Sequence, residues 1–367
     1  MHRHRIREIA DQSGLSAATV DRVLNQRSGV RGSTAAQVQR AIAELDRQRD
    51  QVQLGGRTFR LDLVMQAPAR FSSAVRTALE AELPGLRPAV IRSRFHLREE
   101  GPPIELAQVL DVIGKRGSAG VLLKAPDHPA VLDAVDRLHD QGIPVVTLVT
   151  DLALSRRIGY VGIDNRAAGA TAAYLVTRMS QDPAASVLVT LSSSSFRGEE
   201  EREIGFRSTM RSLDPGRTIR EVSETDGLDA TMLAAVTRAL EHDPDLGAVY
   251  SIGGGNTAIV EAFRRAGRTP APFVAHDLDG DNKTLLRHGH LTAVLHHDLR
   301  ADLRRACQLI LQAQHALPGR PQSVPSHVQV ITPFNQPPPL PTVEPGPVGH
   351  RPAPTGPAAR AARAGSG

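Results

Sequence analysis

Near the N-terminus, an arginine and two alanines have the residue types that read DNA bases. Arg22 offers a planar guanidinium, which can donate two hydrogen bonds to O6 and N7 of one guanine. Ala17 and Ala18 precede it, and small apolar side chains contact thymine methyl groups. The polar residues around them are of the kinds that contact phosphate oxygens: Ser16, Thr19, Asn25 and Arg31. We therefore expect a DNA-binding surface made of these seven residues.

A second set of residues, spread over the rest of the chain, has the chemistry to bind a polyhydroxylated ligand. Asp and Asn share paired hydrogen bonds with neighbouring hydroxyls, Arg donates a planar fork, and an aromatic ring covers an apolar sugar face. The candidates follow short apolar runs, where strands would end: Phe71, Ser72, Asn165, Arg197, Asn256, Asp277 and His297. Any of them could instead cap a helix or form a turn; Asp277 could cap a helix at 279–288.

The first set needs a helix–turn–helix to position it, and residues 5–25 have that pattern. Apolar residues recur at helical spacing on both sides of a break at Gly14, and Ser16 is placed as the N-cap of the second helix. That helix would present Arg22 to the major groove. The alternative is an ordinary helical hairpin. Charge argues against it, because residues 1–60 hold eleven Arg against six acidic residues, as phosphate contact requires.

This segment resembles the DNA-binding headpiece of the LacI/GalR family of bacterial transcriptional regulators. Asp21 departs from the family's commonest residue, Ser. A carboxylate facing DNA is repulsive unless it accepts from a cytosine amine or pairs with Arg22 or Arg27. The resemblance implies a homodimer that reads a pseudo-palindromic operator in double-stranded DNA. The matching residues are Ile9-Ala10, Gly14-Leu15-Ser16, Thr19-Val20, 22–25 and 29–31.

From residue 60 onward, short apolar runs alternate with amphipathic helical patterns. This alternation predicts an α/β fold with doubly wound parallel sheets, and the length of the segment favours two lobes. The runs lie at 61–65, 89–91, 119–123, 145–149, 187–191, 248–252, 273–275 and 291–295. We expect a small all-α headpiece at 1–48, a hinge or linker at 49–59, a two-lobed core at 60–332 and a disordered Pro- and Gly-rich tail at 333–367. Lobe 1 would hold about 60–162 and 291–325, and lobe 2 about 163–290.

The expected linker is polar and contains Gly55-Gly56. In the resembled family this segment holds a hinge helix that wedges apolar residues into the minor groove. Only Val52 and Leu54 could serve here, and a glycine pair weakens a helix. The sequence therefore leaves open whether the hinge is helical.

Residues 60–330 resemble the sugar-binding core that LacI-family regulators share with periplasmic binding proteins. The most specific matches are 160–169, 196–206, 249–256 and 276–279. In that fold the ligand lies in the cleft between the lobes, beyond the carboxyl ends of the strands. His297 stands where the family usually has Gln, which could make affinity pH-sensitive. The resemblance implies effector contacts from Asn165, Arg197, Asn256 and Asp277.

Features that would indicate an enzyme, a cofactor or a metal are weak. The glycines at 253–255 lack the Lys of a P-loop, and the serines at 192–195 lack a nucleophile elbow. The histidines at 288, 290, 296 and 297 lack zinc-ligand spacing. We therefore expect no catalytic residues, no cofactor and no metal. Cys307 is the single cysteine, and no apolar run or N-terminal signal indicates a membrane span or export, which fits the cytoplasm.

The sequence thus predicts a ligand-responsive transcriptional regulator of sugar or polyol uptake or catabolism genes, with repression as the expected sign. Effector binding would close the cleft and change the spacing of the two headpieces. Two alternatives remain open. A solute-binding protein of a sugar transporter would share the core but would need an export signal. An α/β enzyme acting on a sugar would need a catalytic set.

Overall fold

The computed structural model describes residues 4–27, 30–54, 57–86 and 89–337, with the backbone alone for 47–54. The expected disordered tail lies, from residue 338 onward, outside the described residues. Among the described helices, none has the length and apolar character to cross a bilayer.

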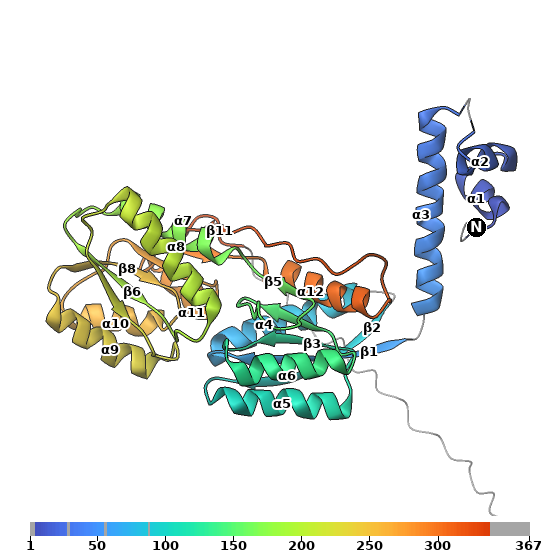
Figure 1. Cartoon of the computed structure of the whole chain (residues 1–367). Helices are drawn as coiled ribbons and strands as arrows, with labels where there is room; N and C mark the ends of the chain where they lie inside the picture. Colours follow the sequence, from blue (N-terminus) through green and yellow to red (C-terminus); the bar gives the residue numbers. More distant parts are fainter. Residues whose placement is uncertain (1–3, 28–29, 55–56, 87–88, 338–367) are drawn as a thin grey trace, which may run out of the picture. The chain divides into compact units, whose positions relative to one another are not determined.

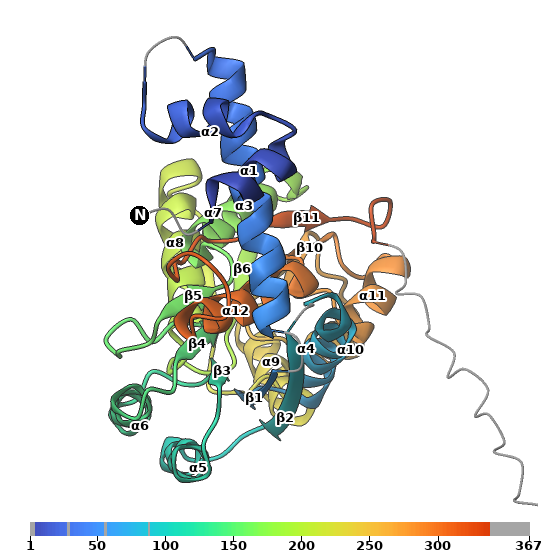
Figure 2. The ribbon, with the colours of Figure 1, turned by 90° about the vertical axis from the view of Figure 1, so that its right-hand side faces the viewer.

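Three helices form the headpiece: α1 (Ile6–Ser13), α2 (Ala17–Leu24) and α3 (Gly32–Leu54). α1 and α2 lie beside the N-terminal half of α3 (Figure 2). Ile9, Val20 and Val38, one from each helix, are fully buried between them. The Ser16 hydroxyl accepts a hydrogen bond from the Thr19 amide at 3.1 Å. The predicted helix–turn–helix and its N-cap are therefore confirmed.

The first part of the predicted linker is helical, a point that the sequence left open, because α3 continues as one helix to Leu54. Thr58 and Phe59 already belong to the first strand of the core, so the connection between helix and strand is only 55–57. A glycine costs about 1 kcal/mol inside a helix. Here the helix ends immediately before Gly55-Gly56, so the pair does not interrupt it.

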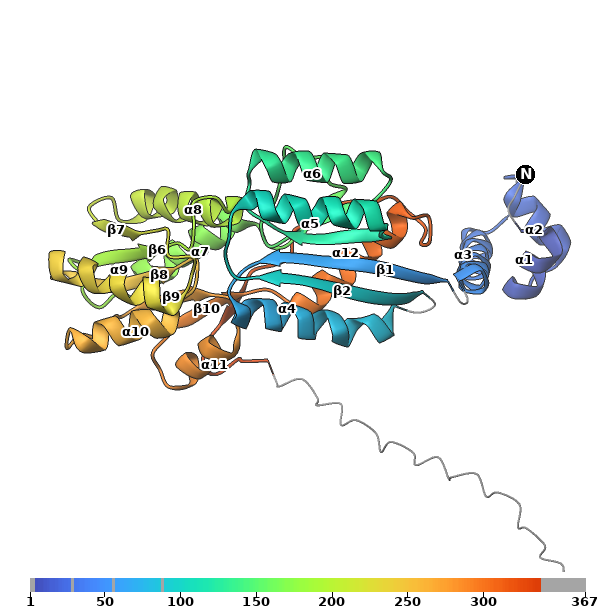
Figure 3. The same cartoon turned by 90° about the horizontal axis from the view of Figure 1, so that it is seen from below.

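The first lobe of the core is a five-stranded parallel sheet with the order β2-β1-β3-β4-β5. α5 (Pro103–Arg116) and α6 (Pro129–Asp140) cover one face of this sheet, while α4 (Ala69–Glu82) and α12 (Leu299–Ala313) cover the other (Figure 3). A short 3₁₀ helix, η1 (Leu83–Gly85), follows α4. The strands are β1 (Thr58–Gln66), β2 (Val90–Arg98), β3 (Gly120–Lys124), β4 (Val145–Leu148) and β5 (Gly159–Val161).

The second lobe is a six-stranded sheet with the order β11-β10-β9-β8-β6-β7, in which only the β10–β11 pair is antiparallel. α7 (Asn165–Met179) and α8 (Arg197–Leu213) cover one face, and α9 (Asp229–His242), α10 (Asn256–Arg265) and α11 (Gly280–Arg287) cover the other (Figure 1). The strands are β6 (Ser186–Thr190), β7 (Ile219–Val222), β8 (Leu246–Ser251), β9 (Phe273–His276), β10 (Ala293–His296) and β11 (Gln329–Ile331). The predicted α/β class, with parallel sheets behind a small helical headpiece, is confirmed.

The lobe boundary expected at residue 291 is wrong, because β10 pairs with β9 in the second sheet. Only α12 returns to the first lobe, where it packs against α4 and β5, and β11 then rejoins the second sheet. An apolar run reveals a strand but not the sheet with which the strand pairs. The chain therefore crosses between the lobes three times, after β5, after β10 and before β11. The first and third crossovers are bonded directly, since the Ser326 amide donates to the Gly162 carbonyl at 2.8 Å.

Candidate functional site

The outer face of α2 carries the residues predicted to read bases. Ala17, Ala18 and Arg22 are exposed, while Val20 on the opposite face is fully buried in the headpiece core. The packing of α2 on the other two helices therefore leaves the Arg22 guanidinium available to a ligand outside the headpiece.

The polar residues around Arg22 bond to one another. The Asp21 carboxylate accepts from the Asn25 side-chain amide at 2.8 Å and lies 3.4 Å from an Arg27 nitrogen. These partners offset the repulsion that Asp21 would otherwise exert on DNA. The Ser16 and Thr19 hydroxyls lie 2.8 Å apart. Arg31 is exposed just before α3.

A second candidate site is an open cavity between the two lobes, with a volume of about 740 Å³ that includes solvent at its mouth. Most of its polar lining side chains are charged. The first lobe contributes Gln66, Arg70, Phe71, Glu99, Lys124 and Thr150. The second contributes Ser192, Phe196, Glu199, Arg202, Asp226, His276, Asp277, Asp279 and Asn282.

Arg202 reaches the cavity because α7 and α8 pack with their backbones in contact. A Cβ atom at Gly169 would lie 1.9 Å from the Arg202 carbonyl oxygen, and one at Gly205 would lie 2.2 Å from the Arg166 carbonyl oxygen. Only glycine permits this approach. Arg202 is buried, and its Nε donates to Asn165 Oδ1 at 2.8 Å. Its Nη2 is buried and has no hydrogen-bond partner among the described residues, which leaves a donor for a ligand.

Lys124 is the second buried cation of the cavity. Its Nζ donates to the Gln66 carbonyl at 3.0 Å and lies 4.0 Å from the centre of the Phe196 ring, on the opposite lobe. Burial lowers the pKa of Lys124 to about 8, although Glu199 and Asp277 favour its charged form. The amine can therefore donate hydrogen bonds to a ligand at neutral pH.

Asp277 lines the cavity in a left-handed backbone conformation, with φ of +65°. Its Oδ1 lies 3.7 Å from Nε2 of His297, which is buried behind it. Burial alone would raise the pKa of Asp277, but His297 and Arg202 outweigh burial and hold this pKa below its usual range. The cavity therefore presents an ionised carboxylate at this point.

Asp279 caps α11, since its carboxylate accepts from the Asn282 amide at 2.9 Å. The alternative in which Asp277 caps this helix is therefore wrong. Asp279 also lies 3.4 Å from Arg70 Nε of the opposite lobe. Burial raises the pKa of Asp279 to about 6, against the opposing effects of the Asn282 amide and Arg70.

Of the seven residues predicted to contact the effector, Phe71 and Asp277 line the cavity. Three others are buried and bond to other side chains: Asn165 to Arg202, Asn256 to Asn282, and His297 to Asp302.

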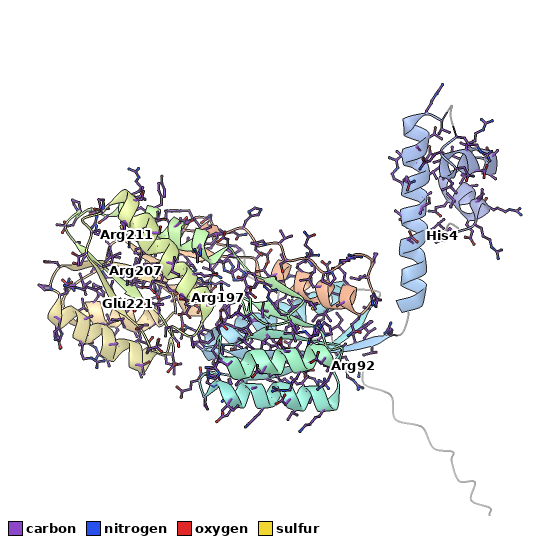
Figure 4. All side chains as sticks on the ribbon, in the orientation of Figure 1. His4, Arg92, Arg197, Arg207, Arg211 and Glu221 are labelled. Carbon is purple, nitrogen blue, oxygen red and sulfur yellow. The ribbon has the colours of Figure 1, made fainter. Side chains whose placement is uncertain are left out.

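The other two predicted residues, Ser72 and Arg197, also lie outside the cavity lining. The Ser72 hydroxyl donates to the Ala67 carbonyl at 3.2 Å. Arg197 begins α8 (Figure 4). It pairs with Glu201 at 3.3 Å and with Asp127 of the first lobe at 3.9 Å.

The position of a residue after a predicted strand thus identifies segments near the cavity, but not which side chain of each segment lines it. Arg202 has a signal that this criterion did not use. It falls on a helical stripe with Gly198, Gly205 and Phe206, where a lone arginine among small and apolar residues indicates a buried charge. Lys124 likewise ends an otherwise apolar run.

Metal ligands do not gather in this region or elsewhere in the described part of the chain. No group of three or more His, Cys, Asp or Glu side chains there could hold a metal ion.

Comparison with known families assigns both parts of the chain. Residues 5–49 match the bacterial regulatory proteins of the lacI family. Residues 73–314 match the periplasmic binding protein domain. None of the curated proteins matches the chain.

Solved structures similar to this chain share its fold at low sequence identity. GanP, a glucose-galactose binding protein from Geobacillus stearothermophilus, is 18% identical with a TM-score of 0.68, over 76% of this chain and 99% of GanP. A solute-binding protein from Burkholderia graminis, in complex with D-arabinose, is 18% identical with a TM-score of 0.68, over 77% of this chain and 97% of its own. A solute-binding protein from Agrobacterium vitis, bound with α-D-tagatopyranose, is 19% identical with a TM-score of 0.67, over 76% of this chain and 95% of its own.

Proposed function

Because this chain belongs to the lacI family of bacterial regulatory proteins and has a periplasmic binding protein domain as its core, we propose that it is a sugar-responsive DNA-binding regulator. It acts as a repressor of genes for sugar or polyol uptake or catabolism, in the cytoplasm. The observation that carries the proposal is that one chain combines an exposed Arg22 on a helix–turn–helix with a charged cavity between two lobes.

DNA binding is assigned to the outer face of α2. Arg22 donates to guanine, Ala17 and Ala18 contact bases, and Ser16, Thr19, Asn25 and Arg31 contact phosphates. The chain acts as a homodimer, because one small headpiece offers too little contact area for specific recognition of an operator.

The effector is assigned to the interlobe cavity and is a sugar or polyol. GanP is a glucose-galactose binding protein, the other two solute-binding proteins are bound to D-arabinose and α-D-tagatopyranose, and their fold is that of this core. The cavity supplies what a sugar needs: an ionised carboxylate at Asp277, donors at Arg202 and Lys124, and an aromatic side chain at Phe71.

The effector assignment is tested by thermal unfolding of the full chain with D-glucose, D-galactose, D-arabinose and D-tagatose. A binding sugar raises the unfolding temperature by mass action. The same sugar is then expected to change the affinity for DNA, since linkage requires that ligand and DNA influence each other equally. A sugar that stabilises the protein but leaves DNA affinity unchanged would contradict regulation.

The DNA assignment is tested with Arg22→Ala. Duplexes that the wild-type chain binds best are first selected from a random pool. Arg22→Ala is expected to bind these duplexes no more tightly than random DNA, because the bidentate guanine contact is worth about 1–3 kcal/mol in each half-site. Fluorescence anisotropy measures both affinities. Arg7→Ala, an exposed position on α1, is the control and should retain the preference. Retained preference in Arg22→Ala would exclude this readout.

A further inference from the structure

The three crossovers between the lobes are joined by a buried chain of side chains that begins at the cavity. Asp277 lies on the cavity wall, and His297, its neighbour at 3.7 Å, stands on the second crossover directly after β10. The other ring nitrogen of His297, Nδ1, hydrogen bonds to the Asp302 carboxylate in the first turn of α12. Asp302 in turn accepts from the Ser326 hydroxyl on the third crossover.

Ser326 completes the connection to the first crossover. Its amide donates to the Gly162 carbonyl at 2.8 Å, and Ser326 and Ile163 form an isolated parallel bridge. A continuous path therefore leads from a cavity carboxylate to all three segments that must bend when the lobes move. Hinge motions concentrate in a few such residues at the ends of elements.

We infer that His297 is a positioning residue, whose positive charge holds Asp277 toward the cavity and ties it to Asp302 of the hinge. An effector that contacts Asp277 is thereby coupled to the lobe crossovers through one buried imidazolium. The inference rests on the proposed function, since it takes the cavity as the effector site, and it assigns the regulation of that site.

The groups that face His297 come from several elements and favour its charge. Asp277 follows β9 and Asp302 belongs to α12, so a carboxylate lies near each ring nitrogen. Two neighbouring histidines and Arg202 of α8 oppose the positive charge of His297. The positive charge of Arg202 also lowers the pKa of Asp277 and of His276. His276 is on β9, and His296, whose ring centre lies 5.9 Å from that of His297, is on β10.

The three histidines therefore differ in charge. Burial lowers the pKa of His276 well below its usual range and that of His296 to about 4. Burial also opposes the charge of His297, but Asp277 and Asp302 outweigh it and raise this pKa to about 9. The charged His297 side chain contributes fully to the stability of the folded protein below pH 6.5, the pKa of histidine in the unfolded chain. This contribution is lost as pH rises through the folded-state pKa of about 9.

The first test needs no effector. Thermal unfolding of the full chain is followed from pH 6 to 10 in the wild type and in His297→Gln, which keeps hydrogen bonding without the charge. We expect the variant to unfold several degrees lower at pH 6.5 and the difference to shrink toward pH 10. His290→Gln, on the surface, is the control and should follow the wild type. A difference that stays constant with pH would show a merely structural role and overturn the inference.

If His297→Gln does not fold, the wild type can be titrated directly. In ¹³C-histidine-labelled protein, one imidazole is expected to titrate near pH 9, and Asp302→Asn should lower that midpoint. The absence of any histidine midpoint above pH 7.5 would overturn the inference.

The second test uses D-galactose as the probe. Its Kd is expected to rise more between pH 7 and 10 in the wild type than in His297→Gln, by up to about tenfold, the limit for one proton lost near pH 9. Lys124 is present in both proteins, so its own titration cancels in the comparison. Equal pH dependence in the two proteins would overturn the coupling. If no sugar of the panel binds, the proposed ligand class fails, while the histidine titration still decides the charge of His297.

Discussion

At the scale of single residues, the cavity contains an incompletely bonded guanidinium. Arg202 donates to Asn165 at 2.8 Å, while its Nη2 has no partner in the described part of the chain. A buried donor without a partner costs about 1–3 kcal/mol, and a ligand hydroxyl would recover part of that cost. The binding of a polar ligand should therefore depend strongly on Arg202.

The comparison of Arg202→Met with Arg197→Met tests this dependence. In the sugar panel, Arg202→Met is expected to lose the rise in unfolding temperature, because hydrogen bonds from charged groups contribute about 1.5–3 kcal/mol. Arg197→Met should keep the rise, since Arg197 pairs with Glu201 and, at 3.9 Å, with Asp127 of the first lobe, and none of the three lines the cavity. The opposite result would assign the effector contact to Arg197, as the sequence pattern predicted.

Which arginine lines the cavity could not be predicted from position after a strand. Both arginines lie on α8, five residues apart, and only Arg202 is on the face that packs against α7. That face is set by the close approach at Gly169 and Gly205, a contact between helices distant in sequence. Phe71, in the first turn of α4, and Asp277, directly after β9, do line the cavity, since both come soon after the end of a strand.

At the scale of elements, a buried carboxylate joins β1, β2 and the end of α5. Asp62 is fully buried and accepts two hydrogen bonds from Arg94, at 3.0 and 2.6 Å. His96 and Arg116 lie 2.9 and 2.8 Å away from the same carboxylate. Burial alone would raise the pKa of Asp62, but its bonds to Arg94, Ser118 and His96 together lower it.

Asp62→Asn is expected to destabilise the first lobe by about 3 kcal/mol, since removing one partner of a buried ion pair leaves the others uncompensated. Urea unfolding at pH 7 measures this loss. The extra stability of the wild type over Asp62→Asn is present above pH 3.8, the pKa of Asp in the unfolded chain. It is lost as pH falls through the lower pKa that Asp62 has in the folded protein.

The matched control for Asp62→Asn is Asp111→Asn, which breaks a similar bidentate pair with Arg137 at 2.9 and 3.0 Å. This pair is exposed, so its loss should cost less than about 1 kcal/mol. Equal losses in the two variants would contradict the role of burial.

The elements themselves were largely predictable, and the exceptions have a physical cause. Each long apolar run gave a strand, because the side chains of central parallel strands are buried on both faces. β7 and β11 escaped prediction, since each has only three or four residues and each ends a sheet. The sheet to which β10 belongs depends on pairing with β9, which no local pattern reports.

At the scale of the whole core, the lobes are bonded to each other across the cavity. The Asp127 amide of the first lobe donates to the Ser195 carbonyl of the second at 2.8 Å, and the Gly198 amide donates to the Thr150 hydroxyl at 2.9 Å. Arg70 adds a third link, with its Nη2 2.7 Å from the Gly227 carbonyl. The structure therefore shows the lobes in contact around the cavity.

Arg70→Ala should shift the core toward an open arrangement, because it removes both the bond to Gly227 and the ion pair with Asp279. Two charge-assisted contacts of about 1.5 kcal/mol each are enough to change the ratio of closed to open molecules by more than tenfold. Small-angle scattering of the sugar-free protein should give a larger radius of gyration for Arg70→Ala than for the wild type. A saturating panel sugar should restore the wild-type value, with a Kd raised by the same factor.

Arg76→Ala is the control, since Arg76 lies on the same helix and pairs with Glu80 within the first lobe. Equal radii for all three proteins would mean that Arg70 does not hold the lobes together, and closure would then depend on the other contacts between the lobes, at Ser195, Gly198 and Arg197.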